Sequence, residues 1–80
     1  MIDITDEHMT ATAGGVSVAT ARWSWHAAAD GHGAWIVSTH PARLFSRGQA
    51  ITALTLAERL AVGYGDDDPC VVSWRKELFL

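Results

Sequence analysis

The chain has 80 residues, of which 49% are apolar and 19% are charged, and its formal net charge is −3. This length predicts a single domain, residues 1–80, with a modest core. The composition excludes an intrinsically disordered chain. The mild negative charge argues against a strong non-specific grip on nucleic acid.

No apolar run reaches the length of about 18 residues that a membrane-spanning helix needs. The amino terminus also lacks the cationic start and apolar segment of a secretory signal. The single cysteine, Cys70, excludes an internal disulfide framework and is typical of a reducing compartment. We therefore expect a cytoplasmic protein that does not associate with a membrane.

Strand character begins near residue 9. The acidic residues 1–8 are weakly patterned, and we expect them to be frayed, although Ile2 and Ile4 leave open a short edge strand. Residues 9–13 are rich in threonine and favour a strand. The pair Gly14-Gly15 is typical of a tight turn between two strands.

A second strand pattern covers residues 16–28 but changes parity along its length. Its first two valines share one face, whereas Trp23 and Trp25 fall on the other, and a bulge near residues 19–21 would reconcile them. A turn at residues 30–33 leads to a third strand at residues 34–39. That strand places Trp35 and Val37 on one face, and Pro41 ends it.

The clearest helix signal lies in residues 45–63. Ser46 and Gln49 form the pattern of a capping box, and Phe45 precedes the cap as a staple against Ala50. Gly63 offers the left-handed residue that commonly ends a helix. The pattern predicts a helix over about residues 47–62, with Thr52, Thr55 and Arg59 on its solvent side.

The last segment fits two structures. Asp68 followed by Pro69 is typical of a helix start, with an acidic cap and proline at the first helical position. Alternation of apolar residues from Cys70 onward also fits a strand. We favour a short helix over about residues 69–78.

The expected fold is α+β, with an antiparallel sheet of two or three strands packed against the main helix and closed by the short carboxy-terminal helix. The expected core consists of Val18, Trp23, Trp25, Trp35, Val37, Ala50, Leu54, Ala57, Leu60, Ala61, Val71, Trp74 and Leu78.

Catalytic and metal-binding patterns are weak. His26 and His32 flank one turn, but no pair among the histidines and Cys70 has the spacing of a structural zinc site. The aspartates at 66–68 do not match a calcium-binding loop and are explained by helix capping. Cys70 has no local base that would activate it. We expect no enzyme activity, no bound metal and no cofactor.

Aromatic and basic residues interleave around the second strand and the helix start. Exposed tryptophans stack on unpaired bases in some sheets, with arginine reaching the phosphates, whereas buried ones only fill the core. The basic residues near the helix start also offer a site for an anion. The candidate binding residues are Arg22, Trp23, Trp25, Trp35, Arg43 and Arg47.

Residues 16–62 resemble the three-stranded amino-terminal arm-binding domains of phage-type integrases. The resemblance rests on the order of elements, strands followed by a helix. The helix opens with Phe45-Ser46-Arg47 and Gln49-Ala50, and a tryptophan in a strand precedes the short segment that leads into it. The resemblance implies a sheet that inserts into the major groove of DNA. This sequence departs from the pattern in having no lysine or arginine between Trp23 and Pro41.

Residues 35–80 resemble small uncharacterised proteins of actinobacterial phages and their hosts. The resemblance rests on four segments: QAITAL at 49–54, LAE at 56–58, DDP at 67–69 and WR-x-EL at 74–78. The resemblance implies a cytoplasmic accessory protein that acts on a host protein, and no site residues transfer with it.

The expected function is that of a small non-enzymatic interaction protein whose partner is another protein, with a homodimer as one form of that partnership. Abundant tryptophan, a strand that is apolar on both faces and the lack of a catalytic constellation favour it. The alternative is a nucleic-acid-binding module that uses the sheet together with Arg22, Arg43 and Arg47.

Overall fold

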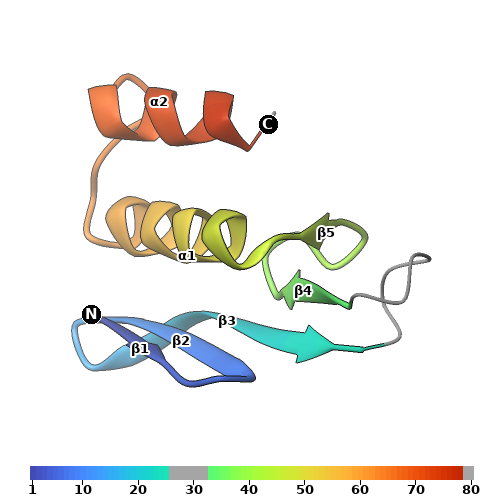
Figure 1. Ribbon diagram of the computed structural model, residues 1–80. Coiled ribbons are helices and arrows are strands. Elements are labelled where there is room, and N and C mark those ends of the chain that lie inside the picture. Colours follow the sequence, from blue (N-terminus) through green and yellow to red (C-terminus); the bar gives the residue numbers. More distant parts are fainter. Residues whose placement is uncertain (26–32, 79–80) are drawn as a thin grey trace.

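A computed structural model describes residues 1–25 and 33–78, and it has the expected α+β class. A five-stranded antiparallel sheet in the order β1-β2-β3-β4-β5 replaces the expected two or three strands. Helix α1 lies on one face of the sheet, and α2 lies on the far side of α1 (Figure 1). The elements are β1 (Ile2–Ile4), β2 (His8–Ala13), β3 (Val16–Ser24), β4 (Ala34–Val37), β5 (Leu44–Phe45), α1 (Arg47–Ala61) and α2 (Pro69–Glu77).

The expectation of a frayed terminus over residues 1–8 is wrong, because β1 pairs with β2 as an edge strand. Both isoleucines of β1 lie on the face of the sheet that α1 covers, because Ile2 is opposite Ala11 and Ile4 is opposite Met9, which are buried on that face. The ammonium group of Met1 also lies 2.8 Å from a carboxylate oxygen of Glu58 on α1. Ile2 packs against the core while Ile4 stays exposed, and the ion pair ties the terminus to α1.

The hairpin between β2 and β3 follows the glycine pattern. Gly14 and Gly15 have φ of 60° and 78°, as a tight turn with two left-handed residues requires. The register then shifts, since Ala11 pairs with Ala19 while Thr12 pairs with Ser17. The expected bulge therefore exists and leaves out Val18, one residue before the expected position.

Strands β3, β4 and β5 align their largest side chains on the face that α1 covers. Trp23 lies opposite Trp35, and Trp35 lies opposite Phe45. The two-residue β5 has no sequence signal of its own and was not expected as a strand. The sheet supplies these buried residues of the core: Met9, Ala11, Ala19, Ala21, Trp35, Val37 and Phe45.

Helix α1 begins as the capping pattern predicts. The backbone N–H of Gln49 donates to Ser46 Oγ at 3.2 Å, and the backbone N–H of Ser46 donates to Gln49 Oε1 at 3.0 Å. Phe45 and Ala50 are buried in the same apolar cluster. The helix ends at Ala61, and Gly63 follows with a φ of 107°.

The side of α1 that was predicted to face solvent instead faces α2, so that prediction is wrong. Thr52 Oγ1 donates to Glu77 at 3.3 Å, and Arg59 pairs with Asp68 at 2.8 Å. Leu56 lies between these two contacts on the helix surface and is buried. The helix thus buries residues on two sides rather than one.

Two residues expected in the core at the end of α1 are exposed. Leu60 retains 36% of its accessible surface, and Ala61 is also exposed. They belong to the last turn of α1, where both side chains reach solvent. Trp25 is the third expected core residue that lies at the surface.

Helix α2 forms rather than the alternative strand. Its cap residue Asp68 accepts hydrogen bonds from the backbone N–H groups of Cys70 and Val71, both at 3.1 Å, and Pro69 takes the first helical position. Val71 and Leu78 are fully buried. Within the described residues, no helix has the length and apolar character needed to cross a bilayer.

Candidate binding site at the tryptophan pocket

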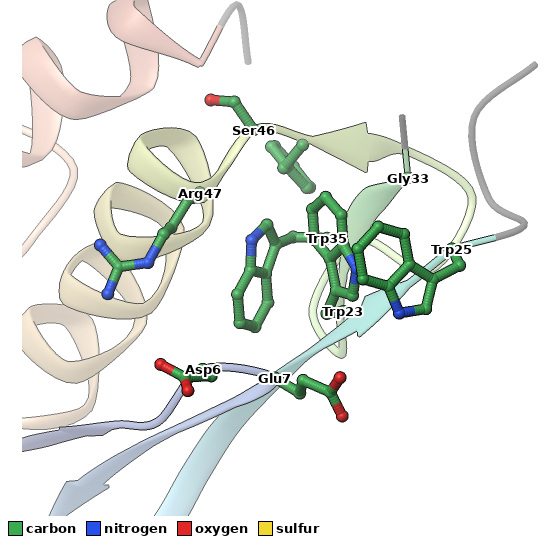
Figure 2. A pocket seen from close by; sticks show the side chains of 9 residues that line it. Asp6, Glu7, Trp23, Trp25, Gly33, Trp35, Ser46 and Arg47 are labelled. Carbon is green, nitrogen blue, oxygen red and sulfur yellow. The ribbon is translucent and has the colours of Figure 1, made fainter. Parts of the chain in front are cut away.

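A pocket of about 580 Å³ opens where the ends of β3 and β4 meet the start of α1. We call it the tryptophan pocket. Its aromatic lining comes from Trp23, Trp25, Trp35 and Phe45, and Asp6, Glu7, Gly33, Ser46 and Arg47 complete it. Figure 2 shows the indoles side by side in a row, with Trp25 at the end away from α1.

Strand geometry explains why the tryptophans gather. Trp23 and Trp25 share a parity along the chain, and Trp35 is the cross-strand partner of Trp23. The ring of Trp23 contacts both others edge to face, with centroid separations of 5.3 Å to Trp25 and 5.9 Å to Trp35. The rings of Trp23 and Trp25 meet on one face, as their shared parity predicts, although β3 ends at Ser24 and Trp25 follows it.

Burial falls steeply along this row. Trp35 is 1% exposed, Trp23 is half-buried, and Trp25 is 62% exposed. The inner ring therefore belongs to the core, while the outer ring presents a large apolar surface to solvent. An exposed indole held by an aromatic neighbour is typical of an interaction surface.

Gly33 permits the close approach of the chain to the indole of Trp23. Its φ is 78°, which disfavours any residue with a side chain. A Cβ atom there would collide with the Trp23 ring and would lie 2.9 Å from the carbonyl oxygen of Ser24. The shape of the pocket therefore depends on glycine at this position.

Two carboxylates border the pocket from the turn between β1 and β2. The backbone N–H of Trp23 donates to the carbonyl oxygen of Glu7 at 2.9 Å, and that of Thr5 donates to the carbonyl oxygen of His8 at 2.8 Å. These bonds fix the turn beside the aromatic row. Figure 2 shows Asp6 and Glu7 along the same side of the indoles.

Arg47 borders the pocket from the first position of α1. In Figure 2 it extends beside the helix, at the Trp35 end of the row and far from Trp25. Across residues 1–25 and 33–78, no ion pair joins the side chain of Asp6, Glu7 or Arg47 to another group. The pocket thus combines aromatic rings with two carboxylates and has one cation at its helix end.

The predicted site residues fall into two groups. Trp23, Trp25, Trp35 and Arg47 meet in the pocket. Arg22 lies opposite His8 and Ile36 on the outer face of the sheet, which α1 does not cover. Arg43 places its guanidinium carbon 5.1 Å from the ring centroid of Phe45 and does not line the pocket.

Sequence patterns missed the acidic border of the pocket. Asp6 and Glu7 lie in the segment expected to be frayed, so no position was assigned to them. The parity of Ile2 and Ile4 was the available signal, because an edge strand there places the following turn beside Trp23. Phe45 was recognised only as a staple for α1.

The other sites considered from the sequence were a metal site and a reactive cysteine. Within the described part of the chain, no group of three histidine, cysteine, aspartate or glutamate side chains comes together as metal ligands. His26 and His32, which flank the expected turn, and most of that turn at residues 30–33 lie outside the described residues. Cys70 is half-buried at the start of α2.

Comparison of the chain with protein-family models, with curated proteins and with solved structures gives no match.

Proposed function

We propose that this chain is a small non-enzymatic interaction protein that binds a segment of a partner protein in the tryptophan pocket. The carrying observation is the exposed indole of Trp25, held against Trp23 at the mouth of a preformed cavity. Exposing an aromatic ring of this size to water is unfavourable. Covering it with a partner's side chain recovers that free energy.

The acidic border supports a protein partner over a nucleic acid. Asp6 and Glu7 would repel phosphates beside the tryptophans, and Arg22 lies on the other face of the sheet. A gel shift with single-stranded DNA at two salt concentrations separates the two functions. A shift that weakens steeply with salt would favour the nucleic-acid alternative.

Selection from a displayed random-peptide library tests the proposal directly. The wild-type protein should enrich peptides whose binding falls about thirtyfold or more with Trp25→Ala, since truncating an aromatic hot spot at an interface costs about 2 kcal/mol or more. Val16→Ala, which trims an exposed apolar side chain far along β3, is the matched control and should bind normally. The proposal would be contradicted if no peptide is enriched, or if the enriched peptides bind the Trp25→Ala variant as tightly as the wild type.

Homodimerisation and action on a host protein remain predictions from the sequence. Sedimentation of the same purified protein with and without a selected peptide tests the first. A dimer that dissociates when the peptide binds would identify a second copy of the chain as the natural occupant of the pocket.

A further inference from the structure

We propose that the tryptophan pocket takes an arginine side chain of the partner protein. This inference rests on the proposed function and specifies its ligand. Two observations support it: the combination of indole rings with carboxylates at the pocket, and the way in which the same chain holds one of its own arginines.

The internal example is Arg59. Its guanidinium carbon lies 3.8 Å from the ring centroid of Tyr64 and 5.8 Å from that of Trp74. Its Nε and an Nη donate to the two carboxylate oxygens of Asp68 at 2.8 and 3.1 Å. A planar cation is thus held by aromatic faces and by a two-pronged carboxylate contact, the arrangement that suits guanidinium best.

The tryptophan pocket offers the same two components to an external group. Trp23 and Trp25 supply the aromatic surface, and Asp6 and Glu7 supply the negative charge. The hydrogen bond from the backbone N–H of Trp23 to the carbonyl oxygen of Glu7 fixes the main chain of the turn beside the rings, so the acidic side chains are the part of the turn that binding must order. The net charge of −3 adds attraction at long range.

Arg47 sets the direction in which such a ligand enters. A second guanidinium near the start of α1 would meet repulsion from Arg47 and from the positive end of the helix. The Trp25 end of the row lies far from that charge (Figure 2). The incoming arginine therefore places its charged group beside Trp25 and Glu7, with Trp23 behind it.

A pair of matched probes tests the inference on the intact protein. Nα-acetyl-arginine methylamide and its citrulline counterpart have nearly the same shape, but only the first is charged. Binding is followed by the NMR shifts of the tryptophan indole N–H groups. The arginine probe should bind about tenfold more tightly than the citrulline probe, the size expected for a partly desolvated cation over indole.

Charge variants give the second arm. Glu7→Gln should weaken the arginine probe severalfold and leave the citrulline probe unchanged. Asp6→Asn should weaken it less, because Asp6 lies toward the Arg47 end of the pocket (Figure 2). Arg47→Gln should strengthen the arginine probe. Asp67→Asn makes the same charge change at an exposed position on the loop before α2, and it should have no effect beyond a small general one.

The outcomes separate this inference from the proposed function. Equal binding of the two probes, or no effect of Glu7→Gln, would overturn the arginine assignment. Peptides selected through Trp25 that lack arginine would also overturn it while leaving the interaction function standing. Preference for a lysine probe over the arginine probe would exclude guanidinium recognition in particular.

Discussion

At the scale of single residues, a two-pronged ion pair joins Arg59 to Asp68. The carboxylate accepts two hydrogen bonds from the guanidinium and two from backbone N–H groups of α2. The hydrogen bond from Arg59 holds the pKa of Asp68 below its usual range, and the backbone donors act in the same direction. One side chain therefore caps α2 and ties it to α1.

This pKa shift predicts how stability depends on pH. An aspartate in an unfolded chain has a pKa of about 3.9. Because the pKa of Asp68 is lower in the folded state, its contribution is complete above that value and is lost as the pH falls through the folded pKa. Asp68→Asn keeps a capping oxygen but removes the charge.

Urea unfolding at pH 7, 5 and 3 measures the effect. Asp68→Asn should lower the unfolding midpoint at pH 7 and 5, and its difference from the wild type should shrink at pH 3. Asp67→Asn is the control and should follow the wild type. A difference that stays constant across these pH values would show that charge is not what Asp68 contributes.

At the scale of elements, α1 is the central layer of the molecule. Ala50, Ala53 and Leu54 are buried, and α1 contacts β2, β3, β4 and β5. Leu56 is buried on the side marked by the contacts from Thr52 and Arg59 to α2. Small residues allow the helix to lie close to the sheet.

Two leucines of α1 test this arrangement as a matched pair. Leu56→Ala should cost about 2–5 kcal/mol because it leaves a cavity between α1 and α2. Leu60→Ala should cost less than about 1 kcal/mol, since that side chain already contacts water. Chemical denaturation followed by circular dichroism gives both values. Equal losses would contradict the placement of α2.

The helices were more predictable than the sheet. Capping depends on residues close in sequence, so Ser46 with Gln49 and Asp68 with Pro69 identified both starts. The side of α1 that meets α2 depends on packing between distant segments, and Thr52 and Arg59 look like solvent residues until α2 is placed. The strand β1 was expected to be frayed for the same reason: its stability comes from pairing with β2, which the residues of β1 alone do not reveal.

The candidate site was predicted in part. Alternation along the strand expected at residues 16–28 placed Trp23 and Trp25 together, and cross-strand pairing added Trp35. Their different burial follows from the position of α1 above the sheet, which parity does not encode. The contribution of Asp6 and Glu7 required the tertiary position of the first hairpin.

At the scale of the whole molecule, the two ends of the sheet differ in role. Under the body of α1 the sheet is covered, and Met9 and Val37 are fully buried. Near the helix start the row of indoles extends beyond this cover and lines the tryptophan pocket (Figure 2). The turn of the amino-terminal hairpin supplies the acidic border of that pocket. The edge strand β1 thus contributes to the proposed function by positioning this turn.

Intermolecular nuclear Overhauser effects are the most direct test of the central claim, that Trp23 and Trp25 form a preformed site for an arginine side chain. With Nα-acetyl-arginine methylamide present in excess, the side-chain methylenes of the probe should give signals to the indole protons of Trp25 and Trp23. Trp74, which already contacts Arg59, should give none. Signals to Ile36 and Leu44 on the outer face of the sheet instead would contradict the account.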